Sequence, residues 1–209
     1  MKSRFLLLLL ALLPLFAQAA EPVAGADYVE IPGGQPYAPL KGKVEVVELF
    51  GYTCIHCAHF QPLINEWKKK QPAYVRFTPV PAAFGGYWMP YARAYYAAAK
   101  LGVLAGSHDA MFKALHEEGS LPIQNASTDE IAAYYAGKYG VDARAFATAM
   151  DSPAIDVLLE RSKEFATATG IEGTPTIIVN GKYRVTASSF EDALRTTDWL
   201  VARERAARK

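Results

Sequence analysis

The sequence predicts an α/β fold: one sheet covered by helices on both faces, carrying a large helical insertion. Residues 44–50 are rich in β-branched and aromatic types, as in a strand buried on both faces. Residues 90–169 are helical in pattern throughout. Two short strand-like segments follow, joined by Asn180-Gly181, a typical two-residue hairpin turn. The order strand, helix, strand, helical block, hairpin, helix is that of an α/β domain.

The composition fits a single domain with an insertion. The 209 residues are 51% apolar and 21% charged, which excludes collagen-like, coiled-coil and wholly disordered chains. The 22 Lys plus Arg against 21 Asp plus Glu give a net charge of +1. No basic excess points to nucleic acid as a partner.

The N-terminus has the three parts of a cleavable secretory signal. Lys2 and Arg4 precede an apolar stretch, 5–16, and Ala17-Gln18-Ala19 forms a small-x-small cleavage site. A membrane anchor is the alternative, but a stretch this short is below the roughly 20 residues that a spanning helix needs. We therefore expect residues 1–19 to be removed and the product to enter an oxidising compartment.

The first half of the expected mature chain contains four elements. Residues 20–43, rich in proline and glycine, predict an extended leader with turns before the strand at 44–50. An amphipathic helix begins at the two cysteines, contains Pro62 and ends in three lysines that suit the helix dipole. The amphipathic helix is indicated by the helical spacing of its apolar residues, Phe60, Leu63, Ile64 and Trp67. After it, residues 74–80 predict a second strand.

The helical insertion, about 90–169, divides at recognisable start signals. Ser127-x-x-Glu130 is a capping box, and Ser152 before Pro153 predicts an N-cap followed by proline at the first helical position. Its aromatic residues have the spacing of a core rather than of a cofactor site. After the hairpin, Ser188 or Ser189 caps a final helix to Ala206. The predicted pieces are 91–103, 107–117, 127–139, 142–150 and 152–169, and the aromatic residues are Tyr91, Tyr95, Tyr96, Tyr134, Tyr135 and Phe146.

The only two cysteines fall within four positions, as Cys54-Ile55-His56-Cys57. A purely structural disulfide is poorly placed here, since closing so short a loop stabilises the folded protein by only about 2 kcal/mol. A zinc site needs further ligands, and apart from His56 and His59 the other histidines, His108 and His116, stand alone on helices. We therefore expect a redox pair, with no metal and no cofactor.

The position of the pair supports redox chemistry. Cys54 lies where a strand meets a helix, and free backbone N–H groups and the helix dipole stabilise its thiolate there. Cys57, one turn further on, is the buried resolving thiol, and His56 can stabilise the thiolate further. Glu48 is either a buried proton-exchanging acid or a strand-end carboxylate that reaches solvent. Glu45 is expected to reach solvent.

Three motifs together resemble the thioredoxin superfamily. They are Gly51-Tyr52-Thr53-Cys54-Ile55-His56-Cys57 after a strand, Pro62 in the following helix, and Gly173-Thr174-Pro175-Thr176 before a hairpin. The resemblance is narrower still, to the DsbA family of periplasmic thiol:disulfide oxidases. Four features indicate this family: the long insertion, the histidine within the cysteine motif, the signal segment, and Glu48. It covers essentially the whole mature chain, so residues 44–209 are expected to be a thioredoxin-like domain.

The resemblance implies roles for individual residues. Cys54 exchanges disulfides with the substrate, and Cys57 resolves the mixed disulfide. His56 tunes the reactivity of the cysteine pair. Thr174 and Pro175, the latter as a cis-proline, border the substrate groove. The implied partners are unfolded exported polypeptides with cysteines and a DsbB-type inner-membrane quinone reductase that reoxidises a monomeric protein. Three positions depart from the family pattern, where Ile55 replaces proline, Thr174 replaces valine, and Pro79 stands in place of a lysine that partners the buried glutamate.

Two other functions remain open on sequence grounds. A disulfide isomerase or reductase of this fold is one, although isomerases carry a dimerisation domain ahead of the thioredoxin unit and only residues 20–43 precede the first strand here. A metal- or peptide-binding module is the other, and stoichiometric zinc in reduced protein would favour it. An apolar cluster after the second strand suits either peptide binding or core packing. It comprises Phe84, Tyr87, Trp88 and Met89.

Overall fold

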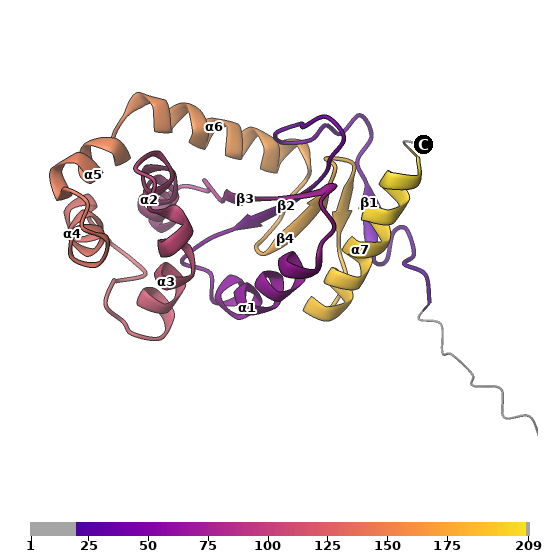
Figure 1. Cartoon of the computed structure of the whole chain (residues 1–209), viewed down its shortest axis with the longest axis horizontal. Helices are drawn as coiled ribbons and strands as arrows, with labels where there is room; N and C mark the ends of the chain where they lie inside the picture. The colour runs from indigo at the N-terminus through magenta and orange to yellow at the C-terminus, as the bar shows by residue number, and fades with distance from the viewer. Residues whose placement is uncertain (1–19, 208–209) are drawn as a thin grey trace, which may run out of the picture.

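The computed structural model describes residues 20–207, so the predicted signal segment lies outside the described residues. A five-stranded sheet with the order β1-β5-β4-β2-β3 forms the centre (Figure 1). Strands β2 and β3 are parallel, and the other neighbouring pairs are antiparallel. The strands are β1 (Tyr28–Glu30), β2 (Val44–Phe50), β3 (Val75–Pro81), β4 (Thr176–Val179) and β5 (Tyr183–Val185). The predicted α/β sheet is confirmed.

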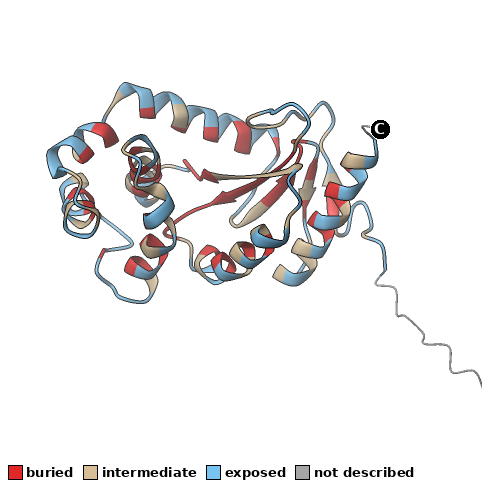
Figure 2. Ribbon diagram, viewed as in Figure 1, coloured by how far each residue is buried: buried red, intermediate tan, exposed pale blue. Residues whose placement is uncertain are grey.

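Helices cover both faces of the sheet. Helices α1 (Ile55–Lys70) and α7 (Phe190–Ala206) pack on the face that carries Val46. Helix α6 (Pro153–Ala168) packs on the opposite face, against Val47. The central strand β2 is consequently buried along its whole length, and β4 along most of its length, whereas much of the edge strand β3 is only half-buried (Figure 2). Because successive strand residues alternate between faces, Glu48 shares the face of Val46 and points towards α1.

Most of the helical insertion lies at one end of the sheet, and its last helix, α6, runs back over one face of the sheet (Figure 1). The insertion comprises α2 (Met89–Lys100), α3 (Leu104–His116), α4 (Thr128–Tyr139), α5 (Ala143–Met150) and α6, with a short 3₁₀ turn at Gly86–Trp88 before it. Its aromatic residues form one cluster with the end of β2, as predicted: Tyr91, Tyr95, Tyr135 and Phe146 are buried in it, and Tyr96 and Tyr134 pack against it. None of the helices within 20–207 is long and apolar enough to cross a bilayer.

The start signals predicted for α4 and α7 are confirmed, that of α6 differs in part, and α2 and α3 begin at Met89 and Leu104 instead of at 91 and 107. Ser127 and Glu130 form the reciprocal capping box, and Ser189 accepts a hydrogen bond from the Asp192 N–H at 3.1 Å. Ser152 is the residue before α6, but its hydroxyl donates backwards to the Ala149 carbonyl at 2.8 Å instead of capping the helix. The preceding helix ends so close by that its carbonyl competes for this hydroxyl.

The extended leader contains a strand that the sequence did not reveal. Residues Tyr28–Glu30 pair antiparallel with β5, with Tyr28 opposite Val185, and form an edge of the sheet. The Tyr28 ring packs edge-on against Tyr183 at 5.8 Å between centroids. Three residues are too short to show an alternating pattern, so only the partner strand identifies this element.

The expectation that Glu45 reaches solvent is wrong. Its side chain is buried and forms an ion pair with Arg76 across the β2–β3 ladder. It also accepts hydrogen bonds from the Thr78 hydroxyl at 2.8 Å and from the Ala38 N–H at 3.1 Å. The leader folds over this end of β2, so a carboxylate near the strand terminus is enclosed and fully hydrogen-bonded.

Candidate active site

A tight turn carries the chain from β2 into α1. The Cys54 N–H donates to the Gly51 carbonyl at 3.0 Å, and Cys54 is the residue that precedes the first turn of α1. A Cβ atom at Gly51 would lie 2.0 Å from the Trp88 ring, so only glycine fits under this indole. The turn therefore places Cys54 at the helix N-terminus, as predicted, where unpaired backbone N–H groups favour an anion.

The Cys54 thiol is half-buried and acidic. A hydrogen bond from the Cys57 thiol to the Cys54 thiolate lowers the pKa of Cys54 to about 5, and the backbone N–H groups of Cys57 and His56 add to this effect against the opposing cost of burial. The Thr174 hydroxyl, whose oxygen has no other hydrogen-bond partner in the described chain, lowers the pKa further. Cys54 is therefore mostly a thiolate at neutral pH.

Cys57 has the opposite character. Its side chain is fully buried on α1, and this burial raises its pKa well above the ordinary value. Its sulfur accepts a hydrogen bond from the Gly51 N–H at 3.5 Å. Both cysteines are free thiols, so the geometry described is that of the reduced protein. One sulfur is accessible and ionised while its neighbour is enclosed and protonated, which is the asymmetry that thiol–disulfide exchange requires.

Of the two alternatives for Glu48, a buried acid or a carboxylate that reaches solvent, the structure shows the buried acid. It is 1% exposed, and neither carboxyl oxygen has a hydrogen-bond partner within residues 20–207. Burial raises its pKa to about 8, and the Lys68 ammonium on α1 partly offsets this shift. Pro79 lies opposite Glu48 in the β2–β3 register, so the cation that acts on this carboxyl comes from α1 instead of from the neighbouring strand.

The loop before β4 closes the other side of the sulfurs. Thr174 and Pro175 are joined by a cis peptide bond, as the resemblance implied. The Cys54 sulfur lies 3.3 Å from the Thr174 carbonyl oxygen, to which the thiol donates when it is protonated, across a sequence separation of 120 residues. The fold thus brings Cys54, Cys57, Glu48 and Thr174 to one place.

The His56 side chain is exposed, and within residues 20–207 its imidazole makes no hydrogen bond to either sulfur. His56 acts on Cys54 through its backbone N–H, which lowers the pKa of the thiol. Three large apolar side chains near the site are exposed. Ile55 next to Cys54 is 44% exposed, and Phe84 and Tyr87 after β3 are 44% and 43% exposed.

His108 and His116 both contact Tyr52 in the turn before Cys54, a role that the sequence did not indicate. Sequence reasoning missed all three residues, since a lone histidine on a helix gives no sign of its partner. Within residues 20–207, no group of three or more His, Cys, Asp or Glu side chains is arranged to hold a metal ion.

Three features define a thiol:disulfide oxidoreductase of the thioredoxin class: an acidic cysteine at a helix start, a buried cysteine three residues further on, and a cis-proline loop against the first sulfur. Residues 34–198 match the family described as Thioredoxin. The thiol:disulfide interchange protein DsbA of Pseudomonas aeruginosa is 40% identical over 215 positions that cover all of both chains.

Further relatives agree. DsbA of Azotobacter vinelandii is 40% identical over 186 residues, 88% of this chain and 85% of its own. The crystal structure of the oxidoreductase DsbA from Xylella fastidiosa superposes with a TM-score of 0.87 at 55% identity, over 90% of this chain and 100% of that one. The chain belongs to the DsbA family, and it is a protein-disulfide oxidoreductase that donates disulfides in oxidative folding.

Proposed function

We propose that Cys54 is the sulfur that exchanges with substrate and that Cys57 is the resolving thiol. A substrate thiolate attacks Cys54 in the oxidised protein, which forms a mixed disulfide and releases Cys57 as a thiolate. A second substrate thiolate then attacks the substrate sulfur of the mixed disulfide, and Cys54 leaves as a thiolate. The substrate dithiol is oxidised to a disulfide while the Cys54–Cys57 pair is reduced. The low pKa of Cys54 supports this assignment, because an acidic thiol is a good leaving group.

Glu48 supplies the proton that the departing Cys57 sulfur takes up. Its pKa of about 8 means that the carboxyl is protonated near neutral pH, and once it has lost its proton the carboxylate charge raises the pKa of Cys57. A buried acid with a pKa near ambient can both give and regain a proton. When Cys57 is oxidised again, the proton returns to the carboxylate.

The substrate binds across Thr174, Pro175 and the exposed Ile55. The Thr174 carbonyl already lies against the Cys54 sulfur, so an extended polypeptide can pair with this loop while its cysteine reaches Cys54. The exposed rings of Phe84 and Tyr87 add apolar surface for unfolded chains. His56, exposed beside Cys54, contributes positive charge when it is protonated.

The substrates are newly exported polypeptides with cysteines, and the compartment is the periplasm. The signal-like segment at residues 1–19 and the acidic, disulfide-donating cysteine support this setting. A DsbB-type quinone reductase of the inner membrane reoxidises the pair, and the protein acts as a monomer without metal or cofactor.

The test is disulfide transfer from the oxidised mature protein to a reduced, unfolded protein with two cysteines. We expect stoichiometric oxidation of the substrate by wild type and none by Cys54→Ser. Cys57→Ser is first loaded at Cys54 as a mixed disulfide with glutathione; the thiolate of a substrate with one cysteine should then attack Cys54, displace glutathione as a thiolate and remain as a mixed disulfide. Substrate oxidation by Cys54→Ser would contradict the proposal. Membranes with and without a DsbB-type reductase test reoxidation, and multiple turnover is expected only with the reductase.

A further inference from the structure

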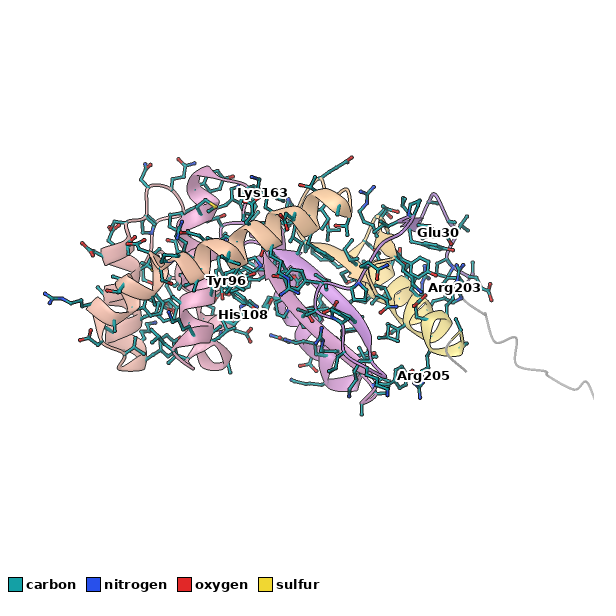
Figure 3. The ribbon with its side chains drawn as sticks, turned by 90° about the horizontal axis from the view of Figure 1, so that it is seen from above. Glu30, Tyr96, His108, Lys163, Arg203 and Arg205 are labelled. Carbon is teal, nitrogen blue, oxygen red and sulfur yellow. The ribbon has the colours of Figure 1, made fainter. Side chains whose placement is uncertain are left out.

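Two histidines of the insertion contact one residue of the active-site turn. Both lie on α3, and the residue they contact is Tyr52, which is 2% exposed. The Tyr52 hydroxyl lies 2.7 Å from His108 Nδ1, and the Tyr52 backbone carbonyl lies 2.7 Å from His116 Nε2. Figure 3 shows His108 on the helical side of the molecule, next to the sheet. Helix α3 therefore contacts both the side chain and the backbone of the residue two positions before Cys54.

The direction of the first hydrogen bond follows from the two titrating groups. Burial lowers the pKa of His108 to about 4 and raises the pKa of Tyr52 well above its usual range. At neutral pH the imidazole is therefore uncharged and the phenol is protonated. The phenol donates to His108 Nδ1, and the rings of Phe50 and Phe112 pack around the pair. The Tyr52 side chain is thus fixed in place.

The second hydrogen bond acts on the backbone of the turn. Because the Cys54 N–H donates to the Gly51 carbonyl, the peptide between Tyr52 and Thr53 is the central peptide of a β-turn. The orientation of this central peptide is what distinguishes the main turn types. A carbonyl oxygen accepts, so His116 Nε2–H donates to it and selects one orientation. The same turn contacts the second sulfur, since the Gly51 N–H donates to Cys57.

We propose that His116 is a positioning residue for the two cysteines. By donating to the Tyr52 carbonyl, His116 fixes the turn that places Cys54 at the N-terminus of α1, where its thiolate is stabilised. Without this donor, the carbonyl oxygen is a partial negative charge two residues from the thiolate and is free to turn towards it. That change disfavours the thiolate and so disfavours the reduced protein. The inference rests on the proposed role of Cys54.

The experiment measures the equilibrium constant between the Cys54–Cys57 pair and glutathione for matched variants of the mature protein. His116→Leu removes the donor, while His116→Gln keeps an N–H group near the position of Nε2. Lys113→Leu, on the exposed side of the same helix, is the control for a changed α3 surface. We expect His116→Leu to be a weaker oxidant by roughly threefold to tenfold, the range that one net hydrogen bond gives. We also expect a higher Cys54 pKa, with His116→Gln within about twofold of wild type.

Each outcome has a distinct meaning. An equilibrium constant for His116→Leu equal to that of wild type would overturn the inference and leave the proposed function standing. Equal shifts in the leucine and glutamine variants would also overturn it, because the ring and not the donor would then matter. A wild-type pair that does not exchange with glutathione would instead overturn the proposed function. If the leucine variant does not fold, His116→Asn, whose amide is too short to reach the carbonyl, replaces it.

Discussion

Reduction of the Cys54–Cys57 disulfide is expected to stabilise this protein near pH 8 and to destabilise it near pH 4. The folded reduced state holds Cys54 with a pKa of about 5, well below the value of about 8.5 in an unfolded chain. A depressed folded pKa gives stability that is complete above the unfolded pKa and is lost as the pH falls through the folded pKa. The oxidised protein has no thiolate and lacks this contribution.

The magnitude follows from that pKa. At about pH 8, three units above the folded pKa, the thiolate contributes roughly 4 kcal/mol before screening. Because Cys54 is only half-buried, we reduce this contribution to about 3 kcal/mol. The four-residue disulfide loop contributes about 2 kcal/mol to the oxidised form at either pH. The buried carboxyl of Glu48 is present in both forms, so its cost largely cancels.

The assay is urea unfolding of both redox forms at about pH 8 and pH 4. We expect the reduced form to be more stable by about 1 kcal/mol at the higher pH and less stable by about 2 kcal/mol at the lower pH. Greater stability of the reduced form is the property for which DsbA proteins are known as oxidants, and here its pH dependence is traced to Cys54. An oxidised form that is more stable by the same amount at both pH values would refute the reasoning.

Three further outcomes are expected. Brief iodoacetamide treatment of the reduced protein should label Cys54 and spare buried Cys57 in a peptide map, and preferential label on Cys57 would reverse their roles. Thr174→Val should raise the Cys54 pKa by roughly half a unit, because the hydroxyl stabilises the thiolate, and an unchanged thiolate titration would contradict this. Glu45→Leu should lower the free energy of urea unfolding by about 2 kcal/mol, since Arg76 loses its buried partner, and a loss below about 0.5 kcal/mol would show that solvent replaces the pair.

Local signals in the sequence were sufficient for most of the elements. The apolar run of β2, the capping box at Ser127 and the Asn180-Gly181 hairpin turn each depend on residues within a few positions of one another. The two turn residues have φ values of 52° and 70°, which this dipeptide adopts readily. The position of Cys54 at a helix start could be predicted for the same reason.

Features that depend on distant partners could not be predicted. The edge strand at Tyr28–Glu30 exists because β5 pairs with it, and Glu45 is buried because Arg76 and the leader enclose it. The contacts of His116 with Tyr52 join residues 64 positions apart. The sequence left open whether Glu48 is buried or reaches solvent, because its burial depends on the packing of α1 against the sheet.

The fraction of protein with an intact Cys54–Cys57 disulfide in a glutathione buffer tests the central claim most directly. A disulfide whose reduced form carries a stabilised thiolate is easily reduced, so at a cytosol-like poise of about −220 to −260 mV we expect almost complete reduction. Structural disulfides, with potentials below about −300 mV, remain oxidised under these conditions. A Cys54–Cys57 pair that stays oxidised there would contradict the account.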